Sequence, residues 1–178
     1  MYKWINNLTK SKVFFFLFVF STTFAQKDVF AVSRNGSLLE LNELLKSDTD
    51  CINKINENGY STLILAIYSN NVEVANYLLQ NVNNINYLSK SGSALMAAVI
   101  KENYEFTKQL IEKKVNLDFQ DSNGQTALIM AINTNNFPII ELLISAKANL
   151  KIKDNYNKEA LDYALKTNNQ KIIKLLNY

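Results

Sequence analysis

The nine residues 124–132, GQTALIMAI, decide the fold, because three similar stretches occur elsewhere in the chain. These are GYSTLILAI from Gly59, SGSALMAAV from Ser91 and NKEALDYAL from Asn157. The leucine that all four stretches share recurs 32, 33 and 33 residues apart, at Leu63, Leu95, Leu128 and Leu161. A fixed period near 33 residues is typical of a solenoid, in which similar units stack on one another.

Each unit predicts two helices. Residues suited to cap a first helix stand at Ser61, Ser93 and Thr126, and a weaker cap, Glu159, stands in the last unit. An alanine follows each shared leucine by three residues, on the same helix face, where neighbouring helices can approach closely: Ala66, Ala98, Ala131 and Ala164. Asparagines suited to cap a second helix recur at Asn71, Asn103, Asn136 and Asn169. One such helix pair cannot bury its own apolar face, but a stack of them can.

The repeat resembles the ankyrin repeat, whose unit reads roughly D-x-x-G-x-T-P-L-H-x-A-A, followed by a helical hairpin and G-A-D-V-N. The nearest match is DSNGQTALIMAI, residues 121–132. The proline and histidine of T-P-L-H are absent throughout, and the glycine of the unit is replaced by Ser91 and Asn157. The resemblance implies an all-α helical-hairpin solenoid of about five units, at approximately 28–55, 56–87, 88–120, 121–153 and 154–178. Unit one is shorter, with its turn between helices at Asn35 and Gly36.

The N-terminal residues have the pattern of a secretory signal peptide. Three lysines, at positions 3, 10 and 12, precede the apolar run 13–20, and Thr23-Phe24-Ala25 fits a cleavage site. We expect cleavage after Ala25, which leaves a domain of residues 26–178; an uncleaved anchor is the alternative. The mature chain then has 16 basic and 16 acidic residues and no net charge. This balance argues against nucleic-acid binding, which requires a clustered basic surface.

The composition argues against catalysis and against a bound metal or cofactor. The chain has no histidine, which removes the commonest general base and most zinc sites, and its four glycines form no phosphate-binding loop. The acidic loop Asp48-Thr49-Asp50 lacks the glycine and distal glutamate of a calcium loop. The single cysteine, Cys51, has no partner for an internal disulfide. We interpret it as a packed residue near a loop, with an intermolecular disulfide as the alternative.

The resemblance also implies where a partner would bind. Ankyrin proteins use their concave face and turn tips to hold other proteins, and the outward positions of the repeat carry over to units two to five. We call these residues the predicted binding strip: Glu57, Asn58, Tyr60, Tyr68, Ser69, Ser89, Lys90, Ile100, Lys101, Ser122, Asn123, Gln125, Asn133, Thr134, Asn155, Tyr156, Lys158, Lys166 and Thr167. Three tyrosines and Ile100 are candidate anchors. The strip contains four lysines and only one carboxylate, which predicts affinity for an acidic protein surface.

These observations predict a secreted or periplasmic bacterial protein, monomeric and non-catalytic, that binds an unidentified protein. The alternative from another class is an exported effector or inhibitor that acts on a host or competitor protein. An enzyme would need a Lys, Asp or Glu mechanism, and no convergent cluster of such residues is visible in the sequence.

Overall fold

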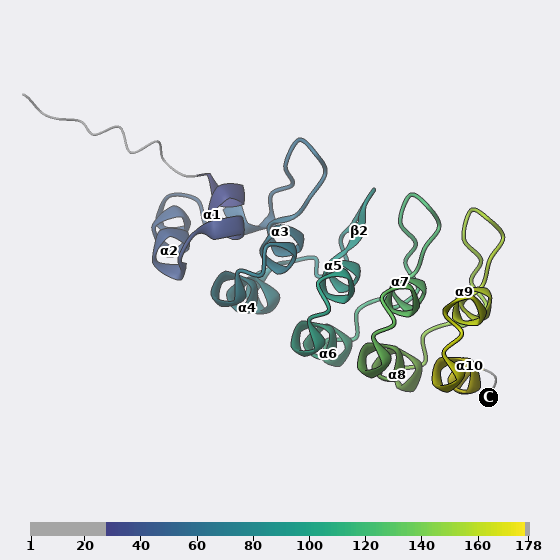
Figure 1. The fold of residues 1–178 in the computed structure, drawn as a ribbon. Helices are drawn as coiled ribbons and strands as arrows, with labels where there is room; N and C mark the ends of the chain where they lie inside the picture. The colour runs from purple at the N-terminus through teal and green to yellow at the C-terminus, as the bar shows by residue number, and fades with distance from the viewer. Residues whose placement is uncertain (1–27, 177–178) are drawn as a thin grey trace, which may run out of the picture.

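The computed structural model describes residues 28–176, which form a curved stack of helix pairs (Figure 1). The predicted signal peptide, residues 1–25, lies outside the described residues. The first helix of each pair, here called an inner helix, is one of α1 (Val29–Asn35), α3 (Thr62–Tyr68), α5 (Ala94–Ile100), α7 (Ala127–Asn133) and α9 (Ala160–Thr167). The second, or outer, helix is one of α2 (Leu38–Ser47), α4 (Val72–Asn81), α6 (Tyr104–Glu112), α8 (Phe137–Ser145) and α10 (Gln170–Leu176).

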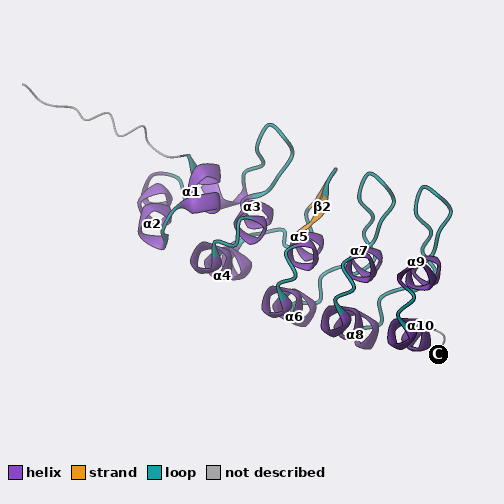
Figure 2. Ribbon diagram, in the orientation of Figure 1, coloured by secondary structure: helices purple, strands orange, loops and turns teal. Residues whose placement is uncertain are grey.

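The two kinds of helix form two layers, and each inner helix packs on the next along the stack. Loops project from the inner layer, as Figure 2 shows; we call them finger loops, and they span residues 55–61, 88–93, 120–126 and 153–159. The only strands in the described part of the chain are β1 (Leu88–Ser89) and β2 (Gly92–Ser93), an antiparallel hairpin in the second finger. The predicted all-α helical-hairpin solenoid is confirmed. No helix between residues 28 and 176 has the length and apolar composition that crossing a bilayer requires.

The inner helices begin where the sequence predicts. The side chains of Ser61, Ser93 and Thr126 accept hydrogen bonds from backbone amides three residues on, at 3.2, 3.4 and 3.3 Å. These bonds satisfy amides that a helix N-terminus otherwise leaves without partners. At α9 the arrangement is reversed, because the amide of Glu159 donates to the carboxylate of Asp162 at 2.8 Å.

The outer helices begin at the periodic asparagines. Asn71, Asn103 and Asn136 accept from backbone amides of α4, α6 and α8, and Asn169 accepts from the amide of Lys171 at 3.0 Å. The residue before each asparagine has a left-handed backbone, with φ between 53° and 56°, and it is an asparagine in three of the four turns: Asn70, Glu102, Asn135 and Asn168. Asparagine tolerates this conformation better than most residues. Unit one uses a Ser37–Glu40 capping box instead.

Asparagine and aspartate side chains also join successive units. The Oδ1 atom of Asn53 accepts from the amide of Asn83 at 2.8 Å, and Asn86 accepts in the same way from Asn116 at 2.7 Å. Asp118 continues the series with Asn149 at 2.8 Å. The side chain of Asn71 donates to two carbonyls of unit one, those of Val32 and Gly36. The high asparagine content therefore has a structural use in this chain.

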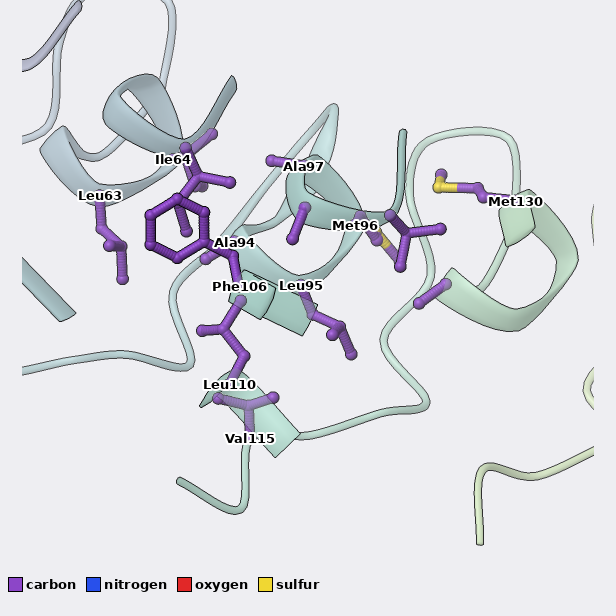
Figure 3. Packing of buried hydrophobic residues seen from close by; sticks show 14 of the residues in the cluster. Leu63, Ile64, Ala94, Leu95, Met96, Ala97, Phe106, Leu110, Val115 and Met130 are labelled. Atoms are coloured by element: carbon purple, nitrogen blue, oxygen red, sulfur yellow. The ribbon is translucent and has the colours of Figure 1, made fainter. Parts of the chain in front are cut away.

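The buried apolar side chains form one cluster that runs along the stack, and Figure 3 shows the part of it from Leu63 to Met130. The alanines of the repeat, at positions 66, 98, 131 and 164, are fully buried, as their place at helix contacts predicts. The shared leucine is buried at Leu63, Leu95 and Leu128, whereas Leu161 of the last unit is only partly buried. Each unit in the middle of the stack, two to four, is covered by a neighbouring unit on both sides, so burial of the core depends on the stacking.

Of the two finger loops in which the glycine of the unit is replaced, one keeps the turn and the other changes it. Gly59, Gly124 and Asn157 all have positive φ, of 79°, 75° and 58°, so Asn157 adopts the conformation that the glycine provides elsewhere. Ser91 does not have positive φ; in its finger the neighbouring Gly92 does, at 120°, and the hairpin of β1 and β2 forms there. The substitution at Ser91 thus changes the loop while the helices keep their places.

Candidate protein-binding surface

A groove of about 600 Å³ opens where the finger loops of units two and three meet the inner helices. Its lining comes from helices α1, α3 and α5 and from the loops around Tyr60 and Ser91. The Tyr60 hydroxyl and the Ser91 hydroxyl lie 2.9 Å apart and link the two fingers. The groove thus combines side chains from three units and exists only in the assembled stack.

The structure places most of the predicted binding strip at the surface. Fifteen of its residues are exposed: Glu57, Asn58, Tyr68, Ser69, Lys90, Ile100, Lys101, Ser122, Asn123, Asn133, Thr134, Asn155, Tyr156, Lys158 and Lys166. Tyr60, Gln125 and Thr167 are half-buried. Six members of the strip line the groove, namely Asn58, Tyr60, Tyr68, Ser69, Ser89 and Ile100. The others lie in the finger loops or at the ends of α5, α7 and α9.

Ser89 does not point outward as the repeat predicts; it is buried, with 6% of its surface exposed. Its hydroxyl donates to the carbonyl of Gly92 at 2.7 Å and accepts from the amide of Ser91 at 3.2 Å. These bonds hold the turn of the β1–β2 hairpin together. The outward expectation came from the variable positions of the ankyrin repeat, and at Ser89 it is wrong because this side chain is bonded within its own hairpin.

Some polar groups of the strip are used between fingers. The amide of Ser122 donates to the carbonyl of Lys90 at 2.9 Å. Asn155 donates twice to the preceding finger, from its amide to the carbonyl of Asn123 at 3.1 Å and from its side chain to the carbonyl of Ser122 at 2.9 Å. These bonds join fingers two, three and four to one another.

Two lysines of the strip lie over aromatic rings. The Lys101 ammonium is 5.2 Å from the ring centre of Tyr68, and the Lys166 ammonium is 4.9 Å from that of Tyr163. A cation at this distance is attracted by the ring. Tyr68 is 53% exposed and Tyr156 is 74% exposed, large aromatic surfaces that suit an interface anchor.

The sequence analysis missed Arg34, which lines the groove from the last turn of α1. It is the only arginine of the chain. Counted from the helix caps, it takes the place of Ile67, Val99 and Ile132, which are fully buried. A charged residue at a position that is apolar in the other units was the signal that could have identified it. Asn56 and Ser91 line the groove as well and were also missed.

Asp154 is buried at the base of the last finger, with 6% of its surface exposed. It accepts from the amides of Tyr156 and Lys158, both at 2.9 Å, and from the hydroxyl of Tyr163. Burial alone would raise the pKa of Asp154, but the bonds from Tyr163 and the two amides outweigh it and lower this pKa below its usual value. The bond to Asp154, with burial, raises the pKa of the Tyr163 hydroxyl.

We expect this pair to stabilise the fold between about pH 4 and pH 10. The lowered pKa of Asp154 means that its contribution is present above the pKa of the unfolded chain and is lost as the pH falls through the folded value. The raised pKa of Tyr163 means that its contribution is lost as the pH rises above about 10.

Asp154→Asn should lower the free energy of unfolding at pH 7 by about 1–3 kcal/mol. It should also flatten the loss of stability in acid, measured by urea unfolding at a series of pH values. The exposed control Glu141→Gln should change the value at pH 7 by less than about 0.5 kcal/mol. An equally steep acid loss in Asp154→Asn and the wild type would contradict the assignment.

The other titratable groups that the sequence singles out lie away from the groove. The carboxylate of Asp48 pairs with Lys54 at 2.5 Å at the surface. Cys51 is buried, and burial, together with the nearby Asp48, raises the pKa of its thiol. In residues 28–176 no three His, Cys, Asp or Glu residues are grouped as a metal site would require.

The fold is a solenoid of helical hairpins, with a groove formed by its first three units. A model of ankyrin repeats in three copies matches residues 29–121 and again 95–178, so the chain belongs to the ankyrin repeat family. Proteins of this family are protein–protein interaction modules and are generally non-catalytic. A search of curated proteins finds no significant match.

Proposed function

We propose that this chain is a non-catalytic binding module that acts outside the cytoplasm and holds an acidic protein partner on its concave face. The observation that carries the proposal is the groove between the inner helices and the fingers, with its exposed Tyr68 and Ile100. Aromatic and aliphatic anchors surrounded by polar groups are typical of protein interfaces. Action outside the cytoplasm rests on the sequence of residues 1–25, with its lysines, apolar run and cleavage pattern.

The preference for an acidic partner rests on the distribution of charge. Arg34 lines the groove, and four exposed lysines lie along the strip, at positions 90, 101, 158 and 166. Glu57 is the only carboxylate among the strip's residues. Opposite charges across an interface increase the association rate and exclude wrong partners more than they add affinity. The proposal therefore includes binding that weakens as the salt concentration rises.

Replacing Tyr60, Tyr68 and Tyr156 with Ala in a tagged full chain should greatly reduce partner capture. Loss of aromatic anchors at the centre of an interface costs about 2 kcal/mol or more, or roughly thirtyfold in affinity. The measurement is affinity capture from the cells that naturally make the protein, with quantification of each protein recovered. The same tagged chain reports its location: recovery from the extracytoplasmic fraction with Gln26 as its first residue is the expected result.

The matched control is Tyr104→Ala, which removes an exposed tyrosine from the start of the outer helix α6. It should leave capture unchanged. Equal capture by the triple variant and the wild type would place the binding surface elsewhere, and an uncleaved chain in the cytoplasm would overturn the proposed location.

A further inference from the structure

The groove has a positive charge that no carboxylate of residues 28–176 pairs with. Arg34 is half-buried in it, and within residues 28–176 it makes no ion pair. Neither aspartate nor glutamate is among the described residues that line the groove. Glu57 is adjacent in sequence to two of the lining residues but does not line the groove itself. A guanidinium presents donors in a fork that fits a carboxylate with two parallel hydrogen bonds.

The remainder of the groove is mainly apolar. Ile64, Leu65 and Ala97 form the part of the lining that belongs to the buried helix faces. Tyr68 and Ile100 stand beside it and are 53% and 41% exposed, so apolar surface is available to a partner. A volume of about 600 Å³ lies within the range of pockets that bury small ligands, which is room for a few side chains of a peptide.

Polar groups in the fingers suit a peptide backbone. Asn56, Asn58 and Ser91 line the groove from the finger loops. The Asn56 oxygen already accepts from the amide of Tyr60, and the Ser91 hydroxyl is paired with that of Tyr60. The side-chain amide of Asn58 can both donate and accept, as a passing main chain requires. One cation, an apolar surface beside it and a polar edge together define the chemistry of what would fit.

We infer that the groove binds an extended segment of the partner in which a carboxylate and an aliphatic or aromatic side chain stand two residues apart, and therefore on the same face of the segment. The carboxylate pairs with Arg34, and the apolar side chain packs against Tyr68 and Ile100. This inference rests on the proposed function and specifies its partner: recognition is centred on units one to three. The lysines of unit five, Lys158 and Lys166, then add general attraction without selecting the segment.

The test uses labelled nine-residue peptide pools and the full chain, with binding followed by fluorescence anisotropy. The first pool has Asp or Glu at positions 1, 5 and 9, Leu, Ile, Val or Phe at positions 3 and 7, and Ser at the even positions. A second pool has Lys in place of the acids, and a third keeps the acids but has Ser at positions 3 and 7 as well. Only the first pool should bind well, and Arg34→Gln should weaken it at least about tenfold, as expected for a lost charged hydrogen bond. Lys158→Gln, which removes the same charge from unit five, should weaken it less than about threefold.

Three results would overturn the inference: no binding of the first pool, equal binding of the second or third pool, or equal effects of Arg34→Gln and Lys158→Gln. Thermal unfolding followed by circular dichroism shows whether Arg34→Gln is folded. If it is not, the comparison of the three pools on the wild-type chain decides the question alone. Failure here is distinct from failure of the proposed function. If the chain captures a protein through its tyrosines but does not bind the first pool, the proposed function is supported and this inference is overturned.

Discussion

Replacing Leu95 with Ala is expected to lower the free energy of unfolding by about 2–5 kcal/mol. Leu95 is 2% exposed, and its side chain lies on the side of α5 that is nearer Leu110 and Val115 of the same unit (Figure 3). Truncation leaves a cavity in the middle of the stack, where the core is covered by units on both sides. The total stability of a domain is about 5–15 kcal/mol, so this single change should remove a large share of it. Urea unfolding followed by circular dichroism gives the value.

The matched control is Leu161→Ala, which makes the same change at the same repeat position in the last unit. Leu161 is only partly buried, so its truncation removes less packing and should cost about half as much or less. Equal losses of stability at the two positions would contradict the view that the middle units of the stack bury more of the core than the last unit. A change in the slope of the unfolding curve, rather than in its midpoint alone, would indicate that the stack no longer unfolds as one unit.

The helices could be predicted from sequence because their signals are local. A cap, an apolar face and a small residue recur within each unit, and Ser93, Leu95, Ala98 and Asn103 show all of them within eleven residues. Each of these residues acts within its own helix pair, or at a contact that every unit repeats. Repetition then multiplies the signal, since an accidental match at one unit does not recur with a fixed period.

The candidate site was only partly predictable, because it is made of differences between units. Arg34 is significant because the same position is apolar in units two to four, and Ser89 is buried because Gly92 creates a hairpin in one finger. The roles of both residues depend on contacts between units that differ in sequence. The outward positions of an average repeat do not predict such contacts. Tyr60 illustrates the same limit: it is half-buried against the core, and its hydroxyl contacts Ser91 of the next finger.

The bonds between units were also beyond sequence analysis. Nothing near Asn53 or Asn86 in the sequence indicates that each accepts from an amide 30 residues further along. Local asparagine roles, as caps and in left-handed turns, follow from known preferences. The longer-range role requires the spacing of one unit against the next, which packing of the inner helices determines.

Replacing Gly124 with Ala is expected to destabilise the fold more than the same change at Gly59. Both glycines occupy the same turn and have nearly the same φ, 75° and 79°, so an added Cβ costs about 1–2 kcal/mol at either position. At Gly59 a Cβ would meet no atom within 4 Å, whereas at Gly124 it would lie 2.7 Å from the backbone nitrogen of Asn155 and 2.9 Å from Cα of Asp154. The finger of unit five must therefore move, which adds about 1–3 kcal/mol as in other overpacked sites. Urea unfolding of the two variants side by side measures the difference.

Because the backbone cost is shared, the difference between Gly124→Ala and Gly59→Ala isolates the contact between the last two fingers. That contact includes the bond from the Asn155 amide to the carbonyl of Asn123, so Gly124→Ala should also speed hydrogen exchange at Asn155. Equal destabilisation by the two variants would mean that the fingers separate at little cost. The strip would then consist of independent loops rather than one surface of fixed geometry, and a partner that spans units two to five would have to order it on binding. A large difference would instead support a strip whose loops are already ordered by folding, so that a partner would not have to order them on binding.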